Sequence, residues 1–264
     1  HLHGGEATEG CIDEAIRHSI TKMSHLHFVA AEDYRKRVIQ LGENPERVFC
    51  VGGLGIDNIL KLDLLSKQEL ENSLDFKLSV KSMLITFHPV TLEGNTSGDQ
   101  MRELLASLSK FTDFKIIFTK PNADTDGRKI LKLIENFCLD NHNCRAYTSL
   151  GQLRYLSCLK YVDVVVGNSS SGLLEVPSFK IPTVNIGDRQ KGRLKAGCVI
   201  DCSPIKNQII SAIKRAISLD FKESCKVIKN PYGEGGASQK IIQTLESIEL
   251  TDIIKKKFYD IEFR

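Results

Sequence analysis

A turn of small polar residues, GNSSSG at Gly167–Gly172, follows the apolar stretch Asp163–Val166 and precedes a helix that contains Glu175. The backbone amides and hydroxyls of such a turn can approach a phosphate at the helix N-terminus, where the helix dipole also favours an anion. Glu175, in the first turn of that helix, is suited to accept hydrogen bonds from vicinal hydroxyls such as those of a ribose. The structural alternative is a Ser- and Asn-rich helix cap followed by a surface carboxylate.

Three other segments offer groups that could bind an anion. His88 comes directly after MLITF and before Pro89, which places it at the carboxyl end of a strand, where open α/β sheets bind ligands. Arg189 and Arg193, in DRQKGR after TVNIG, carry forked donors that can hold a diphosphate. The glycines at Gly233–Gly236 are a competing phosphate loop. The alternatives are a structural histidine, a solvated loop and a plain turn.

The first helix of the chain carries a candidate acid/base group. Apolar residues recur at helical spacing over Ile12–His25, so we predict an amphipathic helix there. Asp13 lies in its first turn, where free amides favour a carboxylate, and Arg17 follows within ion-pair reach. A structural Asp13–Arg17 pair therefore competes with an acid/base role. Two H-x-H pairs also invite a metal, but period-two packing explains them equally well and no third ligand of matching spacing appears. These pairs are His1 with His3 and His25 with His27.

The elements that position these residues alternate between strands and helices. Ser66 and Glu69 form an S-x-x-E capping box for a short helix through Leu74, and a boundary is expected near residues 75–81. Beyond it, six strands with βα spacing predict a doubly wound parallel sheet. The expected strands are His27–Ala31, Arg47–Gly53, Met83–Phe87, Lys115–Phe118, Arg145–Tyr147, Asp163–Val166, Thr183–Ile186 and Cys198–Asp201; further expected helices are Asp33–Leu41, Ile205–Leu219, Ser238–Ile248 and two centred on Met101–Leu108 and Ile130–Phe137.

The composition excludes several classes of protein. The chain has 264 residues with 41% hydrophobic and 26% charged residues, which is typical of a globular protein of one large or two modest domains. Its 36 Lys and Arg against 33 Asp and Glu are dispersed, so a nucleic-acid partner is not expected. No apolar run reaches the length of a membrane span. The eight cysteines show no CxxC spacing, and we expect neither disulfides nor zinc.

Six co-linear segments carry a resemblance to a known family. They are His1–Phe28 (HLHGGEATEGCIDEAIRHSITKMSHLHF), Thr86–Glu93 (TFHPVTLE), Lys120–Arg128 (KPNADTDGR), Gly167–Phe179 (GNSSSGLLEVPSF), Asn185–Arg193 (NIGDRQKGR) and Asn230–Ser238 (NPYGEGGAS). Through them nearly the whole chain resembles the UDP-N-acetylglucosamine 2-epimerases. The similarity is strongest to the hydrolysing branch, which makes free N-acetylmannosamine-type sugars for sialic- and legionaminic-type nonulosonates.

This resemblance implies an α/β fold with two Rossmann-like doubly wound domains of the GT-B type, facing each other across a deep cleft. Residues 1–78 would be the C-terminal part of the N-terminal domain, which we expect to be incomplete in this chain. Residues 79–264 would form the UDP-binding domain, with C-terminal helices packing back toward the first. The small polar turn, through Ser169, Ser170 and Ser171, would bind the diphosphate. Glu175 would bind the ribose hydroxyls and Arg189 the phosphates, while Arg17 would line the cleft from the other side.

The chemistry implied by the resemblance removes the sugar C2 proton and expels UDP, giving a 2-acetamidoglucal to which the hydrolysing branch adds water. His88 would reach the diphosphate or the glycosidic oxygen, and Asp13 matches the family's acid after HxxGG. Many members carry Glu where this chain has His3, so the work of that carboxylate falls to His3, Glu6 or Glu9. A further catalytic Asp of the family precedes this segment, so we expect the chain alone to be inactive.

The sequence leaves two substrates and three alternative functions open. The His3 version resembles members that act on sialic- or legionaminic-type precursors, so the substrate is UDP-GlcNAc or its 6-deoxy-4-acetamido relative. The alternatives are a non-hydrolysing 2-epimerase, a GT-B glycosyltransferase and a non-catalytic nucleotide-sugar sensor. We expect a UDP-sugar substrate, no cofactor, no metal, no nucleic acid and no membrane. We also expect a cytoplasmic homo-oligomer, either a dimer or a tetramer.

Overall fold

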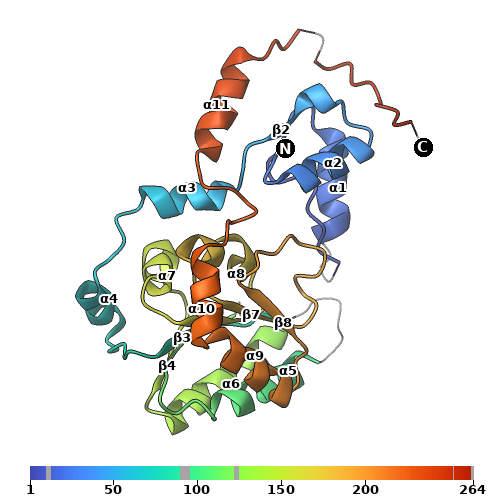
Figure 1. Ribbon diagram of the computed structural model, residues 1–264. Coiled ribbons are helices and arrows are strands. Elements are labelled where there is room, and N and C mark those ends of the chain that lie inside the picture. Colours follow the sequence, from blue (N-terminus) through green and yellow to red (C-terminus); the bar gives the residue numbers. More distant parts are fainter. Residues whose placement is uncertain (10–12, 90–95, 122–124, 252, 263–264) are drawn as a thin grey trace.

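The computed structural model describes residues 1–9, 13–89, 96–121, 125–251 and 253–262. Within them the chain forms two parallel sheets surrounded by helices (Figure 1). The strands are β1 (His27–Val29), β2 (Val48–Cys50), β3 (Ser82–Thr86), β4 (Lys115–Thr119), β5 (Cys144–Tyr147), β6 (Val164–Gly167), β7 (Thr183–Ile186) and β8 (Val199–Cys202). The helices are α1 (Asp13–Met23), α2 (Glu32–Gln40), α3 (Leu54–Lys61), α4 (Lys67–Leu74), α5 (Ser97–Leu108), α6 (Thr125–Asp140), α7 (Gly151–Leu159), α8 (Ser171–Leu174), α9 (Lys206–Ala216), α10 (Leu219–Lys226) and α11 (Ala237–Ser247), with short 3₁₀ helices η1 (Pro45–Arg47) and η2 (Val176–Phe179).

The larger sheet has six parallel strands in the order β5-β4-β3-β6-β7-β8. All six predicted strands are present, and each begins and ends within one residue of its expected bounds. The chain reaches β6 from β5, at the edge of the other half of the sheet. The strand order reverses between the neighbours β3 and β6, where Thr86 is in register with Gly167. In doubly wound sheets the ligand crevice lies at this point, beyond the carboxyl ends of the strands. The predicted doubly wound α/β fold is thus confirmed for this part of the chain.

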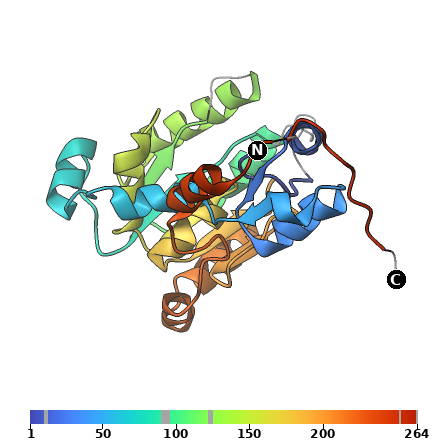
Figure 2. The ribbon, with the colours of Figure 1, turned by 90° about the horizontal axis from the view of Figure 1, so that it is seen from above.

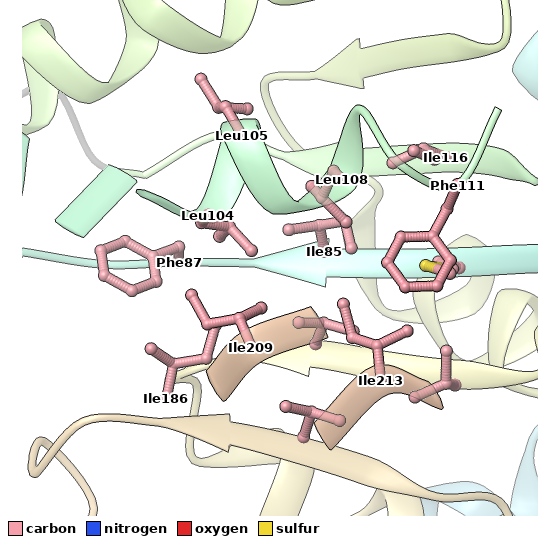
Figure 3. Close-up of a cluster of buried hydrophobic side chains, with 14 of the residues drawn as sticks. Ile85, Phe87, Leu104, Leu105, Leu108, Phe111, Ile116, Ile186, Ile209 and Ile213 are labelled. Atoms are coloured by element: carbon pink, nitrogen blue, oxygen red, sulfur yellow. The ribbon is translucent and has the colours of Figure 1, made fainter. Parts of the chain in front are cut away.

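Helices cover both faces of this sheet because its central strands are apolar on both sides. Met83 and Ile85 of β3 belong to the core beneath α5, α6 and α9, whereas Leu84 belongs to the core beneath α4 and α7. Figure 3 shows Ile85 between Leu104 of α5 and Ile209 of α9. The two buried layers hold the strands rigidly, so the loops at their carboxyl ends have a fixed base.

The smaller sheet pairs β1 with β2 in parallel, and α2 forms the crossover between them. Helix α11 returns from the far end of the chain to this sheet: its Ala237 and Ile241 share a buried cluster with Phe28 and Val51. Figures 1 and 2 show α11, in red, beside the blue N-terminal elements. The chain therefore crosses twice between the two sheets, once through α3 and α4 and once before α11.

Three expectations about helices need correction. The sequence places Glu175 in the first turn of a helix, but α8 is a single turn that ends at Leu174, so Glu175 is its C-cap residue. The helix expected over Ile205–Leu219 ends at Ala216, because Ser218 adopts an extended backbone and becomes the N-cap residue of the separate helix α10. Helix α3 was not predicted, since the glycines of Val51–Gly55 are typical of a loop, although Gly53 serves as its extended N-cap residue. The capping box of Ser66 with Glu69 is confirmed. No helix among the described residues is long and apolar enough to span a bilayer.

Candidate active site

One buried side chain joins the carboxyl ends of β3 and β6. Asn168, directly after β6, accepts a hydrogen bond through Oδ1 from the His88 backbone N–H (2.7 Å) and donates through Nδ2 to the His88 carbonyl (2.8 Å). Gly167 has φ 144°, and a Cβ atom there would lie 1.9 Å from the Thr86 carbonyl oxygen, so the position requires glycine. The His88 loop and the GNSSSG turn are therefore fixed relative to each other.

The GNSSSG turn presents backbone donors at the start of α8. Among the described residues, the N–H groups of Ser169 and Ser170 have no protein acceptor, and both residues are half-buried. Unpaired amides at this position are suited to an anion. The Ser171 hydroxyl, by contrast, donates to Glu175 Oε2 and lies 2.6 Å from the Tyr155 hydroxyl. The anion-binding donors are thus chiefly amides, while Ser171 orients the carboxylate.

A cavity of about 440 Å³ opens beside this turn, at the carboxyl ends of β3, β4 and β5. Glu175 borders it, and burial raises the pKa of this carboxyl group against the opposing hydrogen bond from Ser171. A carboxylate held in this way can accept hydrogen bonds from hydroxyls of a bound ligand. The other lining residues are Thr86, His88, Thr119, Lys120, Thr148, Ser149, Leu150, Gly151, Gln152, Tyr155 and Leu156.

A second cavity of about 440 Å³ lies against α1 and carries the acid/base candidates. His3, Glu6 and Asp13 line it together, as the sequence predicts for a carboxylate-bearing site. Leu174 of α8 and Arg193 line it from the other side, so the cavity lies between the first unit and the large-sheet domain. Its remaining lining residues are His1, Leu2, Ile16, Arg17 and Ile20.

Glu6 is the buried carboxylate of this second cavity, with 4% of its surface exposed. Its Oε2 lies 3.1 Å from an Arg193 nitrogen, and its Oε1 lies 3.8 Å from Nδ1 of His3 and has no hydrogen-bond partner among the described residues. Burial opposes ionisation, but the nearby His3 and the charges of Arg193 and Arg17 together lower the pKa of Glu6. A buried, ionised carboxylate with a free oxygen is equipped to accept a proton.

The structure separates the other sequence candidates. Glu9 is exposed and pairs with Lys191 (3.0 Å), outside the cavity, so of the two glutamates only Glu6 lines it. Arg17 pairs with Glu14 (3.1 Å), so the predicted pair with Asp13 is wrong. The Thr8 N–H donates to the same Glu14 oxygen (2.6 Å), and this bond holds the Glu14 carboxylate next to the Arg17 guanidinium. Asp13 is left exposed at the cavity wall.

A small cavity of about 100 Å³ lies between the two larger ones. It shares Glu175 with the cavity at the carboxyl ends of β3, β4 and β5, and it shares His3 and Leu174 with the cavity against α1. Gly55 of α3 also lines it, and a Cβ atom there would lie 3.5 Å from Glu175 Oε1. The three cavities adjoin one another through these shared wall residues, and together they are called the cleft below.

The two arginines of DRQKGR behave differently. Arg189 donates to the Asn168 carbonyl (3.1 Å), at the small polar turn. Arg193 instead pairs with Glu6 (3.1 Å) and donates to Gln190 (3.0 Å), so its forked donors are engaged by protein acceptors. Sequence reasoning missed Gln190, as well as Tyr155 and Thr148–Gln152. The last segment follows β5, so the rule used for His88 would have found it.

The described residues contain no group of three or more His, Cys, Asp or Glu side chains arranged to hold a metal ion. His27, from one of the H-x-H pairs, is buried and bonds Glu43 at 2.8 Å. The segments Thr86–Glu93 and Lys120–Arg128, quoted for the resemblance, lie partly outside the described residues. Cys11 lies outside them as well.

A doubly wound parallel sheet with cavities at the carboxyl ends of its strands is typical of the nucleotide-binding α/β proteins. The family model of UDP-N-acetylglucosamine 2-epimerase matches residues 1–246. The chain belongs to this family.

Its relatives include a GDP/UDP-N,N'-diacetylbacillosamine 2-epimerase (hydrolyzing) of Campylobacter jejuni, 45% identical over 99% of this chain and 68% of the relative. The polysialic acid biosynthesis protein P7 of Escherichia coli is 42% identical over 99% of this chain and 67% of that protein. The crystal structure of the Neisseria meningitidis UDP-GlcNAc 2-epimerase bound to UDP-GlcNAc has a TM-score of 0.81 at 22% identity, covering 94% of this chain and 69% of that one. The parallel α/β fold is therefore that of the epimerases, and this chain spans about two thirds of their length.

Proposed function

We propose that this chain carries the UDP site and part of the acid/base site of a hydrolysing UDP-sugar 2-epimerase. The observation that carries the proposal is the row of adjoining cavities, which runs from Glu175, beside the small polar turn, to the buried carboxylate of Glu6. The relative with 45% identity is named as a hydrolysing enzyme of a diacetamido sugar nucleotide. This supports hydrolysis over the non-hydrolysing reaction, and it favours the 6-deoxy-2,4-diacetamido substrate over UDP-GlcNAc.

In the proposed UDP site, the amides of Ser169 and Ser170 bind the diphosphate with help from Arg189, and Glu175 binds the ribose hydroxyls. Ser171 holds Glu175 in position through its hydroxyl. His88, whose backbone is fixed to the same turn by Asn168, lies where its ring can donate a proton or a hydrogen bond to the departing oxygen.

The proposed reaction has two steps. A carboxylate takes the C2 proton while the C1–O bond breaks, so the electron pair of the C2–H bond forms the C1–C2 double bond and UDP leaves with the electrons of the C–O bond. Water then adds its oxygen to C1, and a proton returns to C2 from the other face. Glu6 and Asp13 are the residues we assign to these proton transfers. His3, whose Nδ1 lies 3.8 Å from Glu6 Oε1, stands beside Glu6 at the position where many members carry a catalytic Glu, and we keep it as a catalytic candidate.

We assign residues 1–78 to a first Rossmann-like domain and residues 79–264 to the UDP-binding domain. The two separate parallel sheets and the return of α11 to the smaller sheet support this division. Arg17 lines the cleft from the first domain, where it anchors Glu14 and supports the Glu6 carbonyl (3.3 Å). A cytoplasmic homo-oligomer, dimeric or tetrameric, completes the proposal.

The test is proton NMR of UDP-GlcNAc and, separately, its 6-deoxy-4-acetamido analogue, each incubated in D2O with the full-length protein that contains this chain. We expect a free mannosamine-type sugar with deuterium at C2 and one UDP per sugar, more rapidly from the diacetamido substrate. An epimer that keeps its UDP would establish the non-hydrolysing reaction instead. Unchanged sugar nucleotides would refute both reactions and leave the glycosyltransferase or the sensor.

A further inference from the structure

The segment after β7 packs directly onto the segment that carries Glu6. The Glu9 N–H donates to the Lys191 carbonyl (3.1 Å), and a Cβ atom at Gly192 would lie 3.1 Å from the Ala7 side chain. Arg193 then extends from this contact to Glu6. The acid/base end of the cleft and the domain of the large sheet therefore meet at these residues.

A line of buried hydrogen bonds continues from this contact to the anion-binding turn. Arg193 uses one nitrogen for Glu6 Oε2 (3.1 Å) and the other for Gln190 Oε1 (3.0 Å). Gln190, 2% exposed, donates through Nε2 to the Asn168 carbonyl (2.8 Å). The Asn168 side chain in turn bonds both the N–H and the carbonyl of His88. Each link is a direct contact between side chains or between a side chain and the backbone.

Two tyrosines hold the backbone beside Arg193. The Leu194 N–H donates to the Tyr34 hydroxyl (3.1 Å), and the Tyr232 hydroxyl donates to the Leu194 carbonyl (3.0 Å). The two hydroxyls also contact each other at 2.9 Å, and both tyrosines are fully buried. Because Tyr34 comes from α2 and Tyr232 from the segment before α11, the backbone beside Arg193 is held both by the first unit and by the segment that returns to it.

We propose that Arg193 and Gln190 are positioning residues that hold the Glu6 carboxylate in register with His88 and the diphosphate-binding turn. The inference rests on the proposed function and deepens it: both ends of the substrate, the C2 proton and the leaving diphosphate, are then aligned by one continuous set of contacts. An error of about 1 Å in such an alignment lowers turnover by about 100-fold. Neither residue contacts the reacting atoms.

Arg193 also governs the charge of Glu6. The groups facing this carboxylate are His3 from the N-terminal segment, Arg17 from α1, Arg193 from the opposite domain and the hydroxyls of Tyr34 and Tyr232. Removing Arg193 takes away a close positive charge while burial persists, so the pKa of Glu6 rises. A lysine in its place keeps the charge but offers no fork to reach Gln190 and Glu6 together.

The experiment compares Arg193→Met, Arg193→Lys, Gln190→Leu and the control Lys191→Ala in the full-length protein. Lys191 is exposed and pairs only with exposed Glu9 among the described residues, so its variant should keep full kcat. We expect Arg193→Met to lose about 100-fold in kcat. Arg193→Lys and Gln190→Leu should each lose about tenfold, with the Kd for UDP nearly unchanged.

A second readout separates positioning from mere structural support. The Glu6 carboxyl carbon is followed by carbon-13 NMR during a pH titration and during UDP addition. In Arg193→Met its titration and the acidic limb of kcat/KM should move together to higher pH. In Gln190→Leu the titration should stay as in the wild type, while the response of the Glu6 signal to UDP should shrink.

Wild-type turnover decides which idea has failed. If the wild type releases the sugar and Arg193→Lys and Gln190→Leu keep its kcat, the positioning role is overturned while the proposed function stands. The role is likewise overturned if the Glu6 signal responds to UDP equally in the wild type and in Gln190→Leu. If the wild type forms no product, the proposed function has failed, and the UDP response of Glu6 alone decides whether the two sites are linked.

Discussion

At the scale of single residues, the cleft assigns different tasks to carboxylates of similar type through their surroundings. Glu6 is buried but flanked by positive charges, which lower its pKa, whereas Glu175 is half-buried, its carboxylate has only a serine hydroxyl as hydrogen-bonding partner among the described residues, and its pKa is raised by desolvation. The first environment keeps the carboxylate ionised, as a proton acceptor must be, although the lowered pKa also weakens it as a base. A hydrogen-bonding partner for neutral hydroxyls tolerates the second environment. Glu9 is exposed and pairs with a surface lysine.

Glu6→Gln should remove the proposed base while preserving the shape of the site. We expect kcat to fall by about 10²- to 10⁴-fold, the usual contribution of a positioned acid or base, with UDP affinity retained. Exchange of the C2 proton with D2O, followed by NMR, should fall in parallel. The matched control is Glu9→Gln, three residues away, which should behave as the wild type. Equal losses in both variants would remove Glu6 from the mechanism.

Glu175→Ala should weaken UDP binding, because the ribose hydroxyls lose a hydrogen-bond acceptor at the centre of the cleft. The expected loss is about 1–3 kcal/mol of binding free energy, measured by isothermal titration calorimetry. Glu223→Ala, which removes a carboxylate from an exposed ion pair with Lys226, is the control. UDP affinity equal to that of the wild type would make Glu175 a structural partner of Ser171 only.

At the scale of elements, the sequence predicts the parts of the site that depend on local periodicity. Six strands of the large sheet follow from their apolar runs, and the strand rule correctly places His88 and Asn168 at carboxyl ends. The Arg193–Glu6 contact could not be predicted, because it joins residues 187 positions apart that meet only when the two units pack. The Arg17–Glu14 pair escaped prediction for a related reason: the Thr8 amide, which anchors Glu14, lies outside the helix.

The join between α3 and α11 gives a prediction at this scale. Asp57 of α3 is buried and accepts hydrogen bonds from the N–H groups of Ala237 (3.0 Å) and Ser238 (2.7 Å) at the start of α11. Asp57→Asn turns one acceptor oxygen into a donor facing an N–H group, so we expect a loss of about 1–3 kcal/mol in the free energy of unfolding. Urea unfolding followed by circular dichroism measures it, with exposed Asp63→Asn as control.

The same substitution has a defined pH dependence. Burial raises the pKa of Asp57, but the bonds from Ser238 and Ala237 outweigh it and lower the pKa below its ordinary 3.8. A lowered carboxyl pKa stabilises the fold above that ordinary value, and this stabilisation is lost as the pH falls through the lowered one. The stability difference between the wild type and Asp57→Asn should therefore be constant near neutral pH and shrink in acid. A difference that grows in acid would contradict this account.

At the scale of the whole molecule, the last described segment returns to the first helix and sheet. Lys256 donates to the carbonyls of Lys22 (2.9 Å) and Ser24 (2.6 Å) at the end of α1 and lies 2.7 Å from Glu43. Glu43, 2% exposed, also bonds His27 of β1. Because α11 and this segment both pack on the N-terminal unit, the two ends of the chain stabilise one another.

This cluster makes the stability of the whole fold depend on pH above the range in which carboxyl groups titrate. Burial, aided by the charge of Lys256 and opposed by Glu43, lowers the pKa of His27 to about 4 from 6.5. Between these values the unfolded chain binds a proton that the folded chain excludes, so stability falls as the pH drops from 6.5 toward 4. The shift corresponds to a loss of about 3 kcal/mol in the free energy of unfolding over that interval.

His27→Gln abolishes this titration, and urea unfolding at a series of pH values should then give a flatter profile of unfolding free energy between pH 6.5 and 4. His142→Gln, at an exposed position, should keep the wild-type slope. A wild-type slope in His27→Gln would show that the neutral, buried histidine contributes nothing to the pH dependence of the fold.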